Sequence, residues 1–179
     1  MDTARIRPAE PRDLPGLVRI YNHYVTTTHV TFDTQALTID GRRPWFQGFC
    51  GSGAHQLLVA EAAHHVVGYA SSGRFRAKPA YDPSVETTIY LDPEFLGRGI
   101  GPLLCRELLD RMRSEKSAHR AFAGIALPND NSTRLHEGFG FELVGTFREV
   151  GFKFGKYWDV SWYAKNCESA DMAALPSTD

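Results

Sequence analysis

The stretch Leu96-Gly97-Arg98-Gly99-Ile100-Gly101 decides how the rest of this sequence folds, because it lies between a strand-like segment and an amphipathic one. Its three glycines let the backbone turn sharply and aim several N–H groups at one point. The N-terminus of a following helix adds the positive end of its dipole, and Arg98 adds a formal charge. The stretch therefore predicts a phosphate-binding turn between a strand and a helix.

Two common nucleotide motifs do not fit this turn. A P-loop requires Gly-Lys-Ser/Thr at its end, and the dinucleotide fingerprint requires G-x-G-x-x-G after a first strand. By itself the glycine turn is a weak signal, because any tight connection from a strand to a helix favours glycine.

The segments on either side of the turn have clear periodicity. Residues 84–91 are rich in β-branched side chains and predict a strand, and residues 100–112 carry apolar side chains at helical spacing. Further strands are predicted at 4–7, 56–62, 66–75, 121–126, 142–152 and 157–164, and further helices at 14–25, 40–49 and 132–139. This order predicts one mixed α/β domain over residues 1–165, followed by a flexible tail over 166–179.

Composition excludes several classes of protein. The chain has 179 residues and a net charge of -1, without a block of like charges, which argues against a nucleic-acid partner. The three cysteines form no C-x-x-C and no cluster at zinc spacing, so we expect neither a disulfide framework nor a metal. No signal-peptide core or membrane-spanning run is present. We expect a cytoplasmic protein.

Two motifs in this order resemble one known family. Residues 90–104, with the glycine turn at their centre, resemble the acyl-coenzyme A signature of the GNAT N-acetyltransferases, Gln/Arg-x-x-Gly-x-Gly/Ala. Residues 128–141 resemble the second coenzyme A segment of the family, Asn-x-x-Ser followed by a helix and Gly-Phe. The resemblance covers about residues 4–165. Further segments resemble the phosphinothricin and methionine sulfoximine acetyltransferase subgroup, at 20–24, 80–82, 85–90, 127–137, 151–153 and 158–160.

The resemblance implies a fold and a co-substrate. The expected fold is the GNAT fold, a mixed, mostly antiparallel sheet of about seven strands with about four helices, and the expected co-substrate is acetyl-CoA. Leu96 departs from the family pattern, which usually has Gln or Arg there, so we expect modestly weaker coenzyme binding. The residues implied in coenzyme binding are Ile89, Tyr90, Leu91, Gly97, Arg98, Gly99, Ile100, Gly101, Pro102, Asn129 and Ser132.

Acetyl transfer to an amine needs a base, because an alkyl ammonium with a pKa near ~10 is only about one part in a thousand neutral at pH 7. Glu86 lies in an apolar strand, where a carboxylate is either paired or working in a cleft, and the resemblance implies that it is this base. His136 stands where many family members carry a tyrosine proposed to protonate the departing thiolate. It either donates that proton or packs beside the coenzyme without a proton role.

The resemblance places the acceptor amine beside the strand at 84–91. Arg76 or Lys78 can pair with a carboxylate or phosphinate, which suits phosphinothricin, methionine sulfoximine or a related small amine. The alternatives are another small amine, a protein N-terminus, or an acyl-CoA-binding regulatory module without turnover. A homodimer is common among such proteins. The residues implied in acceptor binding are Phe75, Arg76, Lys78, Glu86, Thr87 and Thr88.

Overall fold

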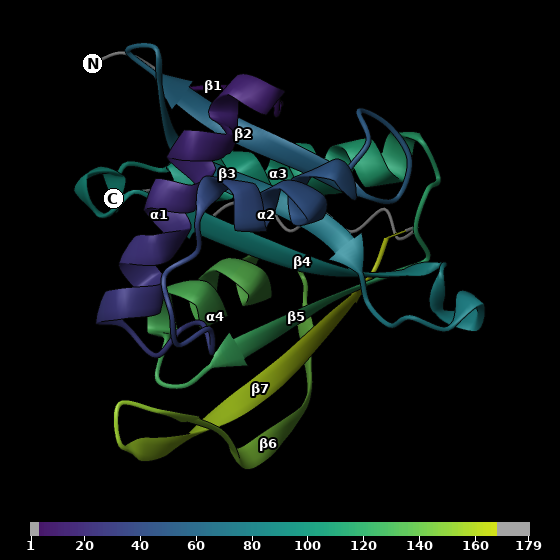
Figure 1. Ribbon diagram of the computed structural model, residues 1–179. Coiled ribbons are helices and arrows are strands. Elements are labelled where there is room, and N and C mark those ends of the chain that lie inside the picture. The colour runs from purple at the N-terminus through teal and green to yellow at the C-terminus, as the bar shows by residue number, and fades with distance from the viewer. Residues whose placement is uncertain (1–3, 168–179) are drawn as a thin grey trace.

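The computed structural model describes residues 4–167, which form one seven-stranded sheet with helices on both faces (Figure 1). The strand order is β1-β2-β3-β4-β5-β7-β6. The strands are β1 (Arg5–Pro8), β2 (Gln56–Ala62), β3 (His65–Arg74), β4 (Ser84–Leu91), β5 (Arg120–Ala126), β6 (Glu142–Lys153) and β7 (Lys156–Asn166). The helices are α1 (Leu14–Thr27), α2 (Ile39–Gln47), α3 (Ile100–Ser114) and α4 (Asp130–Gly138).

Every neighbouring pair of strands is antiparallel except β4 and β5, which are parallel. The predicted fold class, a mostly antiparallel sheet of about seven strands with about four helices, is confirmed. The short helix before the C-terminal hairpin starts at Asp130 rather than at the predicted Ser132. The reason is that the Asn129 side chain accepts the N–H of Ser132 and caps the helix one residue before Asp130.

The sheet carries an apolar core on each face. On one face, α3 packs buried side chains such as Leu104 against Val85 of β4. On the other face, Ile20 of α1 packs with Tyr69 of β3, and α2 covers the neighbouring surface (Figure 1). The sheet is therefore the middle layer between α1 and α2 in front and α3 behind.

This layering fixes the two faces of β4. Val85 points into the core under α3, and side chains alternate along a strand. Glu86, Thr88 and Tyr90 consequently point to the face that α1 and α2 cover, where Tyr90 packs against Tyr69.

The C-terminal strand runs past the boundary that the sequence predicts at residue 165. Asn166 still pairs with Arg120 of β5, and Cys167 is buried with its N–H bonded to the His119 carbonyl at 3.0 Å. The rest of the predicted tail, residues 168–179, lies outside the described residues, so its flexibility stays a prediction.

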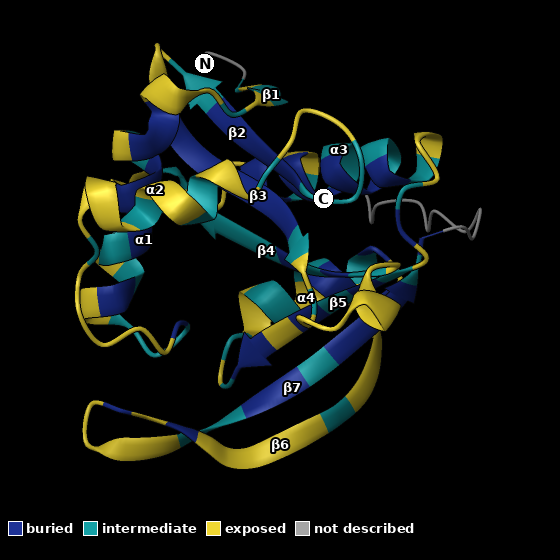
Figure 2. Cartoon of the chain, turned by 45° about the vertical axis from the view of Figure 1, so that its right-hand side comes forward, coloured by how far each residue is buried: buried dark blue, intermediate teal, exposed yellow. Residues whose placement is uncertain are grey.

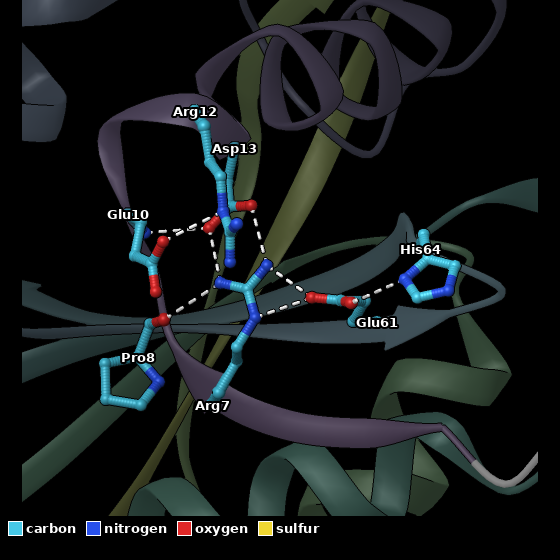
Figure 3. Close-up of polar contacts among 7 residues, drawn as sticks. All are labelled: Arg7, Pro8, Glu10, Arg12, Asp13, Glu61 and His64. Carbon is cyan, nitrogen blue, oxygen red and sulfur yellow. Dashed lines mark hydrogen bonds and ion pairs between the residues drawn. The ribbon is translucent and has the colours of Figure 1, made fainter.

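A buried ion cluster ties the N-terminal strand to its neighbours (Figure 3). The Arg7 guanidinium donates to both carboxylate oxygens of Asp13, at 2.7 and 2.8 Å, and its Nε donates to Glu61 at 2.7 Å. Asp13 also accepts the N–H of Glu10 at 2.7 Å. Burial raises the pKa of the Asp13 carboxyl, but the hydrogen bonds from Arg7 and Glu10 outweigh burial and lower that pKa. The cluster joins β1, the start of α1 and β2.

The edge strand β6 is exposed along most of its length, whereas its partner β7 is largely buried (Figure 2). Its outward surface is apolar, which is unusual for the edge of a sheet in a monomer. The exposed apolar side chains of β6, the turn after it and the start of β7 are Leu143, Val144, Phe147, Val150, Phe152, Phe154 and Tyr157.

Candidate active site

The two parallel strands of the sheet separate soon after they meet. Within residues 4–167, β4 and β5 are in register only from Ser84 opposite Arg120 to Glu86 opposite Phe122. Beyond that point, residues 87–91 pair with β3 alone and residues 123–126 pair with β7 alone. The facing edges therefore present backbone N–H and C=O groups to the gap. Such edges bind an extended, amide-bearing ligand as they would bind an added strand.

A cavity of about 570 Å³, here called the splay cavity, opens between these edges. Its volume lies in the range of ligand-binding pockets. Its walls come from Tyr24, Val30, β4 (Thr87, Thr88, Ile89, Tyr90, Leu91), the glycine turn and α3 (Leu96, Gly97, Gly99, Ile100, Gly101, Pro102), β5 (Ala123, Gly124, Ile125, Ala126), and α4 with the residues beside it (Asn129, Asn131, Ser132, Arg134, Leu135, His136, Gly138, Phe139).

The glycine turn at the mouth of the splay cavity has the conformation expected of an anion site. Gly97 and Gly99 have φ angles of +72° and +75°, which favour glycine because a Cβ is strained there. Gly99 caps α3, whose first-turn N–H groups have no partner within the helix. Ile100 and Gly101 line the cavity, so α3 presents these N–H groups and the positive end of its dipole to it.

His136 lies in the wall of the splay cavity, on α4, with only 4% of its surface exposed. Burial lowers the pKa of its imidazole, although the hydrogen bond with the Ser132 carbonyl opposes this. That hydrogen bond, 2.8 Å long, places the ring proton on Nδ1, because a carbonyl only accepts. Nε2 is therefore an acceptor, and it is buried without a hydrogen-bond partner in the described part of the chain.

A second cavity of about 580 Å³, the α2 cavity, lies on the other side of β4, under α2. Thr88 and Tyr90 line both cavities, so the two spaces meet at β4. The walls of the α2 cavity are Tyr21, Arg42, Trp45, Gly48, Phe49, His55, Ser71, Gly73, Arg74, Glu86, Thr88 and Tyr90.

Glu86 is the one carboxylate among these wall residues, and it is partly buried. Burial raises the pKa of its carboxyl, and the positive charge of nearby Arg76 opposes that rise. A carboxylate with a raised pKa is a stronger base than one in water. Glu86 thus offers a basic oxygen close to where the two cavities meet.

Residues 6–162 match the family model described as Acetyltransferase (GNAT) domain. The chain belongs to the GNAT acetyltransferase family. It is 52% identical over 163 residues to the phosphinothricin N-acetyltransferase of Streptomyces coelicolor, covering 90% of this chain and 95% of the relative.

Two more GNAT relatives are similar over most of their length. The L-methionine sulfoximine/L-methionine sulfone acetyltransferase of Pseudomonas aeruginosa is 33% identical over 171 residues, covering 96% of this chain and 99% of that one. The crystal structure of a phosphinothricin acetyltransferase from Sinorhizobium meliloti in complex with acetyl-CoA superposes with a TM-score of 0.86 at 32% identity, covering 92% and 88%.

Most residues that the sequence predicts for the coenzyme lie together in this GNAT chain. All of them line the splay cavity except Arg98. The Arg98 side chain is exposed, and its guanidinium lies 4.7 Å from the centre of the Phe95 ring. The part of the turn that faces the splay cavity is therefore backbone rather than a formal charge.

The residues predicted for the acceptor are more scattered. Thr87 and Thr88 line the splay cavity, and Glu86 lines the α2 cavity. Phe75 stacks on Phe122 with ring centres 4.3 Å apart, and it lines neither cavity.

Two predicted cations also lie outside the cavity walls. Arg76 is exposed over the Phe75 ring at 4.4 Å, close enough to Glu86 to affect its charge. Lys78 is exposed and lines neither cavity. Of the two cations, Arg76 is therefore the one whose charge affects the Glu86 carboxyl.

The sequence alone missed the residues that α2 and the start of β2 bring to the GNAT site. Arg42 and Trp45 line the α2 cavity because α2 folds over the sheet, and His55 reaches it from the residue before β2. No local motif marks them.

Other chemistries find no support in the described residues. Burial raises the pKa of the Cys105 thiol to about 12, so this cysteine is protonated and unsuited to forming an acyl intermediate. Among residues 4–167, no group of His, Cys, Asp and Glu side chains is placed to hold a metal ion. Within the same range, no helix is both long enough and apolar enough to span a bilayer.

Proposed function

We propose that this GNAT acetyltransferase transfers the acetyl group of acetyl-CoA to the amine of a small amino-acid-like acceptor, such as phosphinothricin, methionine sulfoximine or a related compound. The observation that carries the proposal is the position of Glu86, a partly buried carboxylate beside the junction of two cavities. The names of the relatives from Streptomyces coelicolor and Pseudomonas aeruginosa support the class of acceptor.

In the proposed reaction, acetyl-CoA occupies the splay cavity. Its phosphates lie at the glycine turn, and its pantetheine arm extends along the separated edges of β4 and β5. A backbone N–H within residues 89–91 polarises the thioester carbonyl, as donors of an oxyanion hole do.

The acceptor enters from the side of the α2 cavity as an ammonium ion. Glu86 takes one proton from it, and the neutral nitrogen attacks the thioester carbon. The C–S bond then breaks, the product is an amide, and the thiolate of coenzyme A takes up the second proton that the nitrogen loses. The carboxylate of an amino-acid acceptor pairs with Arg76, which lies near Glu86.

His136 has a different proposed role from proton donation. Because its Nε2 is an acceptor and its pKa is lowered, the neutral ring does not carry a proton for the thiolate. We assign it to packing and hydrogen bonding beside the coenzyme, which is the second of the two roles that the sequence leaves open.

The test is thiol release from acetyl-CoA with a panel of amines. We expect release with phosphinothricin, methionine sulfoximine or methionine sulfone. Release only with peptides would indicate a protein N-terminus as the acceptor. Tight acetyl-CoA binding without release for any amine would contradict the proposal and favour a regulatory module.

We also propose that the protein is a cytoplasmic homodimer. The exposed apolar edge of β6 supports the dimer, because pairing would cover it. The free thiols of Cys50 and Cys105 suit a reducing compartment. Light scattering on the eluted protein tests the dimer, and Phe147→Glu should shift it toward the monomer.

A further inference from the structure

The α2 cavity holds a cation that the reaction proposed above does not use. The Arg42 guanidinium lies between two aromatic rings, 4.5 Å from the centre of Tyr21 and 3.7 Å from that of Trp45. The two rings come from α1 and α2, and they fix the plane of the guanidinium.

No carboxylate within residues 4–167 lies at ion-pair distance from Arg42. Two other arginines, one next to Arg42 in the sequence and one in the same cavity, pair with carboxylates of their own. Arg43 pairs with Asp40 at 3.0 Å, and Arg74 of the same cavity pairs with Asp82 at 3.3 Å. Arg42 is therefore a rigidly held cation in the wall of a cavity, with its charge available to a ligand.

His55 provides a second, independent observation. It lines the same cavity, and its Nε2 atom is buried without a hydrogen-bond partner among the described residues. A buried polar atom of this kind is costly unless something bonds to it. The Arg42 guanidinium, and His55 in the tautomer that carries its proton on Nε2, can both donate to the oxygens of an anion.

The walls of the cavity also carry charges of both signs. Glu86 is acidic, and the cation whose charge affects its carboxyl is Arg76 rather than Arg42. An acceptor that places its amine at Glu86 and its α-carboxylate at Arg76 can therefore extend its side chain across the hydroxyl-lined floor, where Ser71 bonds to Thr88 at 2.8 Å.

We propose that Arg42, assisted by His55, binds the distal oxyanion of the acceptor side chain and so sets a preference for acceptors with an anionic group at that end. This inference rests on the proposed function, since it assigns the specificity of the same site. It adds a recognition residue on α2 to the acceptor residues named above.

Two isosteric acceptors test the effect of the charge on the acceptor's distal group separately from the effect of its shape. Phosphinothricin and L-methionine sulfone both end in a methyl group on a tetrahedral atom with two oxygens, but only the phosphinate is charged. In Arg42→Gln, kcat/KM for phosphinothricin should fall on the order of 50-fold, mostly through KM, because a charge-assisted hydrogen bond is lost. For methionine sulfone it should fall less than about fivefold, because the hydrogen bond lost there is to a neutral oxygen.

Arg43→Gln is the matched control. Arg43 is next to Arg42 in the sequence, but its side chain is exposed and pairs with Asp40 outside the cavity. Arg43→Gln should leave kcat/KM unchanged for both phosphinothricin and methionine sulfone. Arg42→Lys keeps the charge without the planar fork, and it should restore part of the preference for phosphinothricin. It also keeps the test valid if Arg42→Gln fails to fold.

Equal losses for the two acceptors in both Arg42 variants would show a structural role and overturn this inference alone. An unchanged ratio of kcat/KM for phosphinothricin to kcat/KM for methionine sulfone would also overturn this inference. A wild-type enzyme that acetylates methionine sulfone but not phosphinothricin would also overturn it while leaving the acetyltransferase proposal standing. Failure with every amine would overturn both.

Discussion

Glu86 lies directly opposite Phe122, and this is the last residue pair through which β4 and β5 remain in register. The proposed base therefore stands at the point where the two strands part. In the proposed reaction the thioester and the amine meet near this point, since one cavity lies in the split and the other lies along the face that bears Glu86.

Replacement of Glu86 by Gln should lower kcat about 10²- to 10³-fold, because the amine loses its base. Burial raises the pKa of the carboxyl, so the wild-type rate should fall as the pH drops through a value above that of an ordinary glutamate. The variant should lose this acidic limb. Steady-state pH profiles check both effects, with the exposed Glu142→Gln as the control. A variant with wild-type rate and profile would remove Glu86 from the mechanism.

Replacement of His136 by Gln should change kcat by less than about threefold while raising KM for acetyl-CoA about fivefold, because a hydrogen-bond acceptor is retained in altered geometry. Initial rates at varied acetyl-CoA measure both constants. The control is His64→Gln, since His64 is exposed in the turn between β2 and β3. A 100-fold loss in kcat, with a changed alkaline limb, would instead identify His136 as the proton donor.

Replacement of Leu96 by Gln should tighten acetyl-CoA binding. Leu96 is 50% exposed and lines the splay cavity beside the glycine turn, where an amide can reach a phosphate. One added hydrogen bond worth about 1 kcal/mol corresponds to about fivefold in Kd. Calorimetric titration with coenzyme A measures the change. Leu103→Gln, at an exposed position of α3 outside the cavity, should leave Kd as it is.

Replacement of Asp13 by Asn should destabilise the fold by about 2 kcal/mol at pH 7, because the hydrogen bonds from Arg7 to a buried carboxylate are lost and Arg7 keeps only the partly exposed Glu61 as an ionic partner. The folded-state pKa of Asp13 is lowered, so its stabilising effect is present above the unfolded pKa of ~3.9 and is lost as the pH falls through the folded value. The variant should therefore show a weaker loss of stability in acid.

Urea unfolding between pH 3 and pH 7 measures this difference. Glu10→Gln is the control, because its pair with Arg12 is exposed and contributes roughly 0–1 kcal/mol. Equal effects of the two replacements would contradict a special role for the buried cluster. The kcat of the Asp13 variant should be unchanged, since Asp13 lines neither cavity.

Local features of the chain were predictable. Residues 97–101 combine glycines with the start of an amphipathic helix, and both signals lie within a short window. Glu86 was also recognisable as a candidate functional residue, because its charge contrasts with the β-branched and apolar side chains beside it in the strand. In both cases the information that determines the structure is adjacent in sequence.

The positions of the arginine side chains around the site were less predictable for a physical reason. Arg42 reaches the α2 cavity through the packing of α2 on the sheet, and Arg98 turned onto Phe95 instead of facing the cavity. Which of these contacts a long side chain makes is determined only once the tertiary structure has formed. A formal charge near a motif is therefore a poor guide to where its guanidinium lies.

The alternation of β4 makes the site sensitive to the register of this strand as well as to the identity of its side chains. Val85 supports the core under α3 while Glu86 serves the opposite face. Deleting a single residue between Ser84 and Glu86 would exchange the two faces of the strand, bury the carboxylate in the core and shift the edge that receives the coenzyme. Sequence drift in this segment should thus proceed by substitution, with insertions and deletions confined to the loops beyond its ends.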